Sequence, residues 1–465
     1  MQHCTRRAAL GLMAAFTASR FAGPSPGAQR PTEKEGARKA KANSQALKFP
    51  PELPGGEFVV TDTTEEFLQP LGALREGVLV AKTPPAVDFA YFPGQTYEGK
   101  PWSNWGDSAA ARGKYYTAIG DHLAPAGNAF VYEYDPAKKS FRKLLDLRKL
   151  LKLPEGHYVP GKIHSRVDLG RDGWLYCSTH RGSTRVTTDA YHYRGDWIIR
   201  CHPVTGAAEV VVHSPVPKHC IPSGTLDPER LIFYGGTAPG DREDGEGGQF
   251  FAYDCRNRKL LYAGPDGPAR YLILAQSTGR AYYVPGKGQS PLMRFDPADG
   301  KPPLPIDGQI GIRAATRETP QGIVYTVSLG QGDGATATLY AFDTRTEKIE
   351  NLGPAAAGSQ QYVAAISADP TGRYLYYVPG AHGGSDGDGS AVIQFDVTTR
   401  KRKVIALLHP FYERKYGLVP KGTYGLAMDP AGDKLYVTWN VGRGQRAWDC
   451  CGLTVIHIPA TEREL

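Results

Sequence analysis

The most constraining feature of the sequence is a two-part repeat of about fifty residues that recurs over most of the chain. One half is a turn with Gly or Pro followed by a short alternating strand that carries a tyrosine, as in Arg171–Tyr176 and Asp369–Tyr376. The other half is an alternating strand that ends in an aromatic residue and Asp, as in Val131–Asp135 and Val392–Asp396. The marker tyrosines of the repeat are Tyr116, Tyr176, Tyr234, Tyr282, Tyr325, Tyr376 and Tyr436. Seven units result.

A period of this length built from short strands is typical of a β-propeller. We therefore predict an all-β fold, a seven-bladed β-propeller of four-stranded antiparallel blades. Residues 58–92 precede the first clear unit and are predicted to supply the outer strand of the last blade, so that N- and C-terminal strands close the ring. The inner strands of that blade are predicted at Gly425–Met428, Leu435–Trp439 and Leu453–Ile458. One short helix is expected at Phe141–Leu153, where charges lie between leucines.

The N-terminus has the layout of an export signal. Arg6 and Arg7 precede the apolar run Ala8–Ala18, which is too short to span a bilayer. The paired arginines resemble a twin-arginine signal. We predict three segments: an export signal peptide at 1–28, a disordered basic spacer at 29–50, and a single β-propeller domain at 51–465. The protein is thus expected in the periplasm or outside the cell.

Charge and cysteine content limit the partners. The formal net charge is +8, but residues 1–44 carry eight Lys and Arg against two Glu, so the rest of the chain is close to neutral. Nucleic-acid binding, which needs clustered basic charge, is not expected. We predict a monomer without a membrane span whose partner is a polysaccharide or a protein ligand. Six cysteines follow the leader, and their pairing cannot be derived from spacing.

Histidines gather at one kind of position in the repeat. In a propeller the start of each innermost strand and the loop after each second strand lie on the same face, around the central channel. The histidines at such positions are His122, His164, His180, His219 and His382. Each one, taken alone, can equally be a loop histidine bonded to backbone. Together they allow two chemistries, because imidazoles hold divalent metals, whereas arginine and histidine neutralise a uronate carboxylate so that a base can remove the C5 proton.

Other candidates surround this end of the channel. A metal set of His122, His219 and His382 would suit Zn or Mn, and the acidic Gly-rich loops 239–248 and 383–389 could bind Ca. Aromatic and basic side chains at the same positions suit the binding of sugar rings and carboxylates. The predicted substrate-binding residues are Trp102, Trp105, Arg181, Arg313 and Tyr362. The loop 181–196, with Tyr191, His192 and Tyr193, is expected over the same mouth.

Blades with these tyrosine strands and Asp turns resemble exported bacterial propellers of the YVTN/WD40-like superfamily, including the propeller-fold lyases that act on oligogalacturonate or ulvan. The resemblance covers Tyr116 to Ile458 and implies histidines, an arginine and a tyrosine at the channel mouth. The matching catalytic candidates are His164, His180, Arg166 and Tyr424. Two alternatives stay open: a non-catalytic propeller that binds a protein or glycan, and a metal-dependent lactonase or hydrolase.

Overall fold

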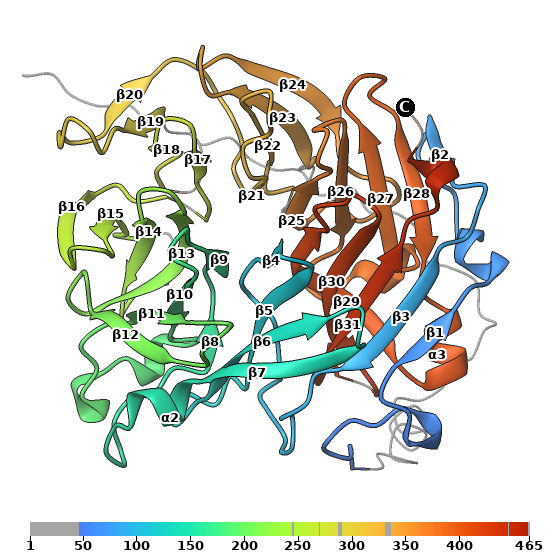
Figure 1. The fold of residues 1–465 in the computed structure, drawn as a ribbon, viewed down its shortest axis with the longest axis horizontal. Helices are drawn as coiled ribbons and strands as arrows, with labels where there is room; N and C mark the ends of the chain where they lie inside the picture. Colours follow the sequence, from blue (N-terminus) through green and yellow to red (C-terminus); the bar gives the residue numbers. More distant parts are fainter. Residues whose placement is uncertain are drawn as a thin grey trace, which may run out of the picture. The chain divides into compact units, whose positions relative to one another are not determined.

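Seven antiparallel sheets arranged in a ring confirm the seven-bladed β-propeller (Figure 1). This computed structural model describes residues 46–243, 246–268, 270–286, 291–330, 336–444 and 446–463. The predicted signal peptide and the spacer up to residue 45 lie outside the described residues. Lys48–Leu465 forms one compact unit. Within the described part of the chain, no helix has the length and apolarity needed to cross a membrane.

Each blade is an antiparallel meander whose first strand faces the channel, and the strands of the first four blades follow in chain order. The first blade contains β4 (Ala109–Ala111), β5 (Lys114–Gly120), β6 (Ala129–Asp135) and β7 (Ser140–Asp146). The second contains β8 (Lys162–Ile163), β9 (Asp168–Leu169), β10 (Leu175–His180), β11 (Trp197–Cys201) and β12 (Ala208–His213). The third contains β13 (His219–Asp227), β14 (Ile232–Pro239), β15 (Gln249–Asp254) and β16 (Lys259–Pro265). The fourth contains β17 (Ile273–Ala275), β18 (Arg280–Tyr283), β19 (Leu292–Phe295) and β20 (Leu304–Ile306).

The last three blades follow the same plan, with N-terminal strands added to two of them. The fifth contains β21 (Ala314–Ala315), β22 (Ile323–Val327), β23 (Thr338–Asp343) and β24 (Ile349–Pro354). The sixth contains β25 (Val363–Ala368), β26 (Tyr374–Pro379), β27 (Ala391–Asp396), β28 (Arg402–Leu407) and, parallel to β28, β2 (Val78–Val80). The seventh contains β29 (Val419–Met428), β30 (Lys434–Gly442), β31 (Cys450–His457), β3 (Ala86–Tyr91) and β1 (Val60–Asp62).

The two halves of the repeat correspond to the second and third strands of a blade. Every marker tyrosine lies on a second strand, and each aromatic-Asp motif ends a third strand. The aspartates close the turns as their chemistry suggests. The carboxylate of Asp135 accepts backbone N–H groups of Ala137 and Lys138, and that of Asp396 accepts those of Thr398 and Thr399.

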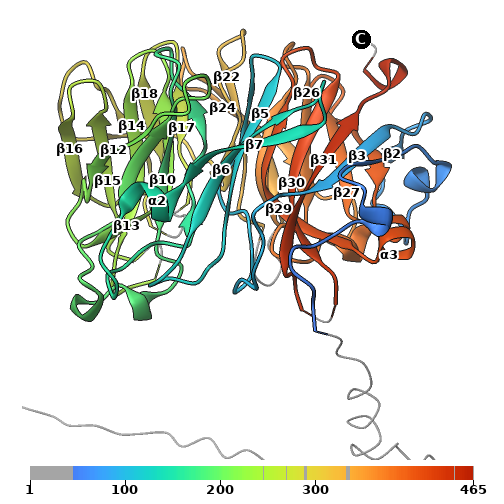
Figure 2. The same ribbon diagram turned by 60° about the horizontal axis from the view of Figure 1, so that its bottom comes forward.

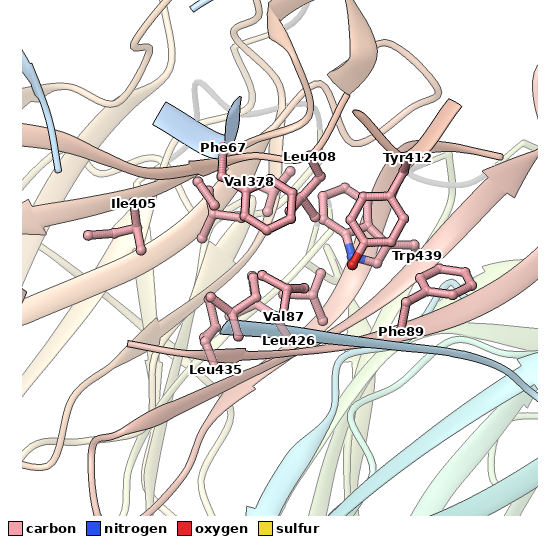
Figure 3. Packing of buried hydrophobic residues seen from close by; sticks show 14 of the residues in the cluster. Phe67, Val87, Phe89, Val378, Ile405, Leu408, Tyr412, Leu426, Leu435 and Trp439 are labelled. Carbon is pink, nitrogen blue, oxygen red and sulfur yellow. The ribbon is translucent and has the colours of Figure 1, made fainter. Parts of the chain in front are cut away.

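The ring is closed by a strand from the N-terminal segment, as predicted. β3 pairs with β31 on one edge, where Val87 lies opposite Ile456, and with β1 on the other. Figure 2 shows β3 beside β31. The core between the sixth and seventh blades forms around this strand. Phe67, Val87 and Phe89 are fully buried there against Trp439 (Figure 3). The last blade is therefore built from both ends of the chain.

The predicted helix at Phe141–Leu153 is wrong over its first half. Ser140–Asp146 forms β7, because it pairs with β6 as the outer edge of the first blade. A helix begins after Asp146, whose side chain accepts the backbone N–H of Lys149. In the part of the chain that the structure describes, the helices are α2 (Leu147–Leu151) and α3 (Phe411–Tyr416), with 3₁₀ turns η1 (Pro54–Gly56), η2 (Glu65–Leu68), η3 (Thr184–Val186), η4 (Asp189–Tyr191), η5 (Ser385–Asp388) and η6 (Ala460–Glu462). The six cysteines after the leader are buried, and no disulfide joins them.

Candidate functional site

One aromatic side chain joins four of the predicted site residues. Trp105 lies just before β4, on the face where innermost strands begin and second strands end, which we call the His face. Its ring centroid lies 5.6 Å from that of His122, 5.9 Å from His164, 5.7 Å from His382 and 4.7 Å from Tyr424. We call these five residues the Trp105 cluster. It combines side chains from the first, second, sixth and seventh blades.

His122 is held by the loop that follows β5. The buried carboxylate of Asp121 accepts the backbone N–H groups of Leu123 and Asn128, which fixes this loop. His122 itself has a φ of 59° and places Nδ1 2.9 Å from the carbonyl oxygen of Lys100. Burial, followed by the charge of Lys162, lowers the pKa of His122 to about 3, so the ring is neutral. Its Nε2 is buried without a hydrogen-bond partner among the described residues.

A break in the innermost strand of the second blade presents His164. β8 ends at Ile163 and pairing resumes only at β9, so residues 164–167 leave the regular ladder. The ring of His164 lies 4.8 Å from that of His180, the last residue of β10. His180 is buried, and its Nδ1 accepts the backbone N–H of Gly182 at 3.0 Å. The two second-blade histidines therefore lie together, and His164 stacks on Trp105.

His382 and Tyr424 form the shortest polar contact within the cluster. Nδ1 of His382 lies 2.7 Å from the phenolic oxygen of Tyr424. Burial, with a smaller contribution from Tyr362, raises the pKa of Tyr424 well above its ordinary value, so the phenol keeps its proton. Burial and the positive charges of Lys162, Arg270 and Arg313 lower the pKa of His382, which keeps its imidazole neutral. In the tautomer of His382 that carries its proton on Nε2, Tyr424 is the donor and Nδ1 of His382 the acceptor.

Positive charge surrounds this pair. The ammonium group of Lys162 lies 4.1 Å from the ring centroid of Trp105. The guanidinium of Arg313 lies 5.5 Å from the ring of Tyr424, and its Nε donates to the hydroxyl of Tyr362 at 2.7 Å. Arg270 is close enough to affect the pKa values of both His382 and Tyr424. Such an arrangement favours an anionic group bound beside Tyr424.

Arg166, Trp102 and Arg181 are engaged elsewhere in the fold. Arg166 is buried in an ion pair with Asp107 at 3.1 Å and donates to the carbonyl oxygen of Ala315 across the channel. It lines a cavity of about 190 Å³ at the other end of the channel, where innermost strands end. Trp102 is fully buried and stacks on Phe130 in the core. Arg181 is buried, and its guanidinium donates to backbone oxygens of the third blade.

The structure does not assemble the predicted metal sets. His219 hydrogen-bonds Thr237 Oγ1 at 2.8 Å in its own blade, away from the ring contacts of His122 and His382. In residues 46–463, apart from the gaps given above, no group of three or more His, Cys, Asp or Glu side chains is placed to hold a metal ion. In the predicted calcium loop 383–389, Asp386 pairs with Lys421, and Asp388 accepts backbone N–H groups. Loop 239–248 is described only in part.

Sequence reasoning left three contributors out of the predicted site. Lys162 begins β8 and Arg270 precedes β17 of the fourth blade, which is the kind of position that identified the other residues. Trp448 follows the second strand of the seventh blade, and its ring lies 6.2 Å from Trp105 and 5.8 Å from His382. The same rule of position, applied to all seven blades, would have found these residues.

A buried carboxyl supports the second blade beneath the His face. Asp196 accepts hydrogen bonds from Thr179 at 2.7 Å, Tyr158 at 3.3 Å and Tyr193 at 3.4 Å. Burial raises its pKa to about 7 despite these bonds. The folded state thus binds this proton more tightly than the unfolded chain. The stabilisation from that proton is complete below about pH 4 and is lost as the pH rises through about 7.

We therefore expect Asp196→Asn to stabilise the protein at alkaline pH. The amide keeps an acceptor for Thr179 and carries no charge, so near pH 8 its unfolding free energy should exceed that of the wild type by on the order of a few kcal/mol. The difference should shrink towards about pH 5. Thermal melting of both proteins across this range measures the effect. A wild-type melting temperature that does not decrease from about pH 5 to about pH 8 would contradict this expectation.

Comparison with known proteins supports the fold. No family model and no curated protein matches the sequence. A solved structure described as oligogalacturonate lyase in complex with manganese matches with a TM-score of 0.51 and 10% identity, covering 88% of this chain and 98% of that one. Oligogalacturonate lyase from Vibrio parahaemolyticus matches with a TM-score of 0.53 and 9% identity, covering 87% and 98%. At this identity the likeness shows that this chain shares their propeller fold.

Proposed function

We propose that this chain is an exported propeller enzyme that cleaves a uronate-containing polysaccharide by β-elimination at the Trp105 cluster. The observation that carries the proposal is the 2.7 Å contact between Tyr424 and His382, flanked by the positive charges of Lys162, Arg270 and Arg313. The oligogalacturonate lyases that share the fold act, as their name says, on a substrate of this class. Export rests on the twin-arginine-like leader.

The positive charges serve to bind and activate the substrate. A uronate carboxylate beside Arg313 and Lys162 has its charge neutralised, and this acidifies the adjacent C5–H bond. The indole of Trp105 is half-buried, and its exposed part offers apolar surface for a sugar ring. In this proposal, these positively charged side chains stabilise the carbanion-like transition state.

The proton at C5 passes to Tyr424. As the phenolic oxygen takes the proton from C5, its own proton moves to Nδ1 of His382, so the phenolate never accumulates. The electron pair from the C5–H bond forms the C4–C5 double bond, and the glycosidic bond at C4 breaks. His164, backed by His180, is the proposed donor of a proton to the leaving oxygen. Arg166, paired with Asp107, has no role in this step.

A divalent metal is not part of the proposal. The oligogalacturonate lyase with the same fold was solved with manganese, but the described residues of this chain do not supply a matching ligand set. Charge neutralisation is assigned to Arg313, Lys162 and Arg270 instead. We expect cleavage to continue after treatment with a chelator, as measured in the assay below.

Incubation of residues 48–465 with a panel of uronate polysaccharides tests the proposal, with the ultraviolet absorbance of the unsaturated product as the readout. The expected result is an increase in absorbance that depends on Tyr424 and His382. Binding of a polysaccharide without any increase would instead support a non-catalytic glycan-binding propeller, which the aromatic surface of Trp105, Tyr362 and Trp448 also favours. If the protein neither cleaves nor binds any of the polysaccharides, both functions are overturned.

The pH dependence of cleavage follows from the Tyr424–His382 pair. His382 must be neutral to accept the proton, and its pKa is lowered by burial and by nearby positive charge. The pKa of Tyr424 is raised far above neutrality by burial. Cleavage also needs the proton that His164 donates to the leaving oxygen. We therefore expect kcat/KM to rise with pH as His382 loses its proton, below the ordinary histidine pKa of about 6.5, and to fall at higher pH as His164 loses its own. A profile that stays level from about pH 7 to about pH 9 would argue that His164 does not donate this proton.

A further inference from the structure

A second cavity opens on the His face between the second and third blades. Its volume is about 370 Å³. It lies where the loop after β10, the start of β13 and the end of β14 meet, which are the same positions that build the Trp105 cluster in other blades. Its walls are formed chiefly by Thr188, Asp189, Tyr193, Lys218, His219 and Asp241, together with two prolines.

The chemistry of this cavity is that of a sugar site. Asp189 and Asp241 offer exposed carboxylates that can accept hydrogen bonds from vicinal hydroxyls, and Asp189 already orients Lys218 through a 2.9 Å ion pair. Pro217, Pro239 and the buried Tyr193 supply apolar surface between these polar groups. A few polar groups set in an apolar wall are what a ring with hydroxyls on its edge requires.

His219 completes the polar lining. Its Nδ1 is engaged by Thr237, which leaves Nε2 as the ring nitrogen for a ligand. Burial lowers the pKa of His219, so the imidazole is neutral and suits a hydroxyl group better than an anion. The cavity thus differs from the Trp105 cluster, where positive charge dominates.

The two sites are joined through consecutive residues. His180 contacts His164 in the Trp105 cluster, whereas Arg181 donates to the carbonyl oxygen of Pro239, which lines the cavity. Both sites therefore involve the second blade and lie on the His face, an arrangement that suits binding of one oligosaccharide across them. We propose that the cavity is a distal subsite that binds the hydroxyl groups of a further sugar unit of the same polysaccharide. This proposal rests on the proposed function of the Trp105 cluster.

Chain-length dependence tests the subsite. In a Tyr424→Phe background, which should bind without cleaving, calorimetry with a uronate disaccharide and a hexasaccharide is compared for Lys218→Ala and Asp241→Asn. Both positions are exposed, so the fold should be kept. We expect each variant to weaken hexasaccharide binding by about three- to tenfold and to leave disaccharide binding unchanged. Lys149→Ala, an exposed lysine beside a hollow on the outer edge of the first blade, is the control and should bind both as the parent does.

Two results would overturn the subsite and can be told apart. If the parent binds both oligomers and the two variants bind them equally well, the subsite is wrong and the Trp105 proposal stands. If the parent binds neither oligomer, the proposed function fails and the subsite fails with it.

Discussion

Replacing Tyr424 with phenylalanine is expected to lower kcat/KM on a uronate polysaccharide by about 10²–10⁴-fold, because the phenolic oxygen is the group that takes the C5 proton. The ring remains, so its contacts with Trp105 and Arg313 are retained. Steady-state kinetics should therefore show the loss mainly in kcat, with KM little changed. His382→Ala added to this variant should cause little further loss, since the two residues act as one unit.

A matched control is available in the sixth blade. Tyr377 is also fully buried and its hydroxyl donates one hydrogen bond, to the carbonyl oxygen of Ala355 at 2.8 Å. Tyr377→Phe should cost about 1 kcal/mol of stability and leave kcat/KM unchanged. If both tyrosine variants lost activity equally, the loss would come from stability, and Tyr424 would have no catalytic role.

Removal of β3 is expected to abolish cooperative folding, whereas a chain that begins at Lys48 should fold. β3 pairs with β31 along Ala86–Tyr91 and buries Val87 and Phe89 completely. Burial of such side chains contributes about 1.5–3 kcal/mol each, and loss of the segment up to Phe92 also removes Phe67 from the core. The combined loss, on the order of 10 kcal/mol, matches the whole stability of a typical domain.

The role of β3 is tested by comparing a chain that starts at Thr83 with a chain that starts at Pro93. The first keeps β3 and loses β1 and β2, so it should retain a single melting transition at a lower temperature. The second leaves the edge of β31 unpaired and should aggregate or lack a transition. Calorimetry with size-exclusion chromatography distinguishes them. An unchanged melting temperature for the chain starting at Pro93 would show that β3 is not needed to close the ring.

The fold could be predicted because the residues that mark the repeat have roles that depend on their neighbours in the sequence. Aspartates such as Asp135 must end a strand to accept backbone N–H groups in the turn. Tyrosines such as Tyr116 recur on the second strand of each blade. The closing strand β3 could be predicted because the last repeat unit supplies only three strands, so its outer strand must come from the N-terminal segment. The helix at Phe141–Leu153 was misplaced because edge strands with alternating charge and leucine resemble an amphipathic helix over so few residues.

The site could be predicted by position but not by side-chain direction. His164 and Arg166 are two apart and would point to one side of an unbroken strand, yet the break between β8 and β9 sends Arg166 to Asp107. Trp102 and Trp105 lie in one short segment, but one packs in the core and the other lies in the cluster. Such differences depend on contacts with other strands and other blades, which local sequence does not encode.

The most direct test of the account is a crystal structure of Tyr424→Phe with a bound uronate oligosaccharide. The account predicts a sugar ring against Trp105, its carboxylate beside Arg313 and Lys162, and its C5 next to the position of the missing hydroxyl. An oligosaccharide bound away from Trp105, or with its carboxylate turned from these positive charges, would contradict it.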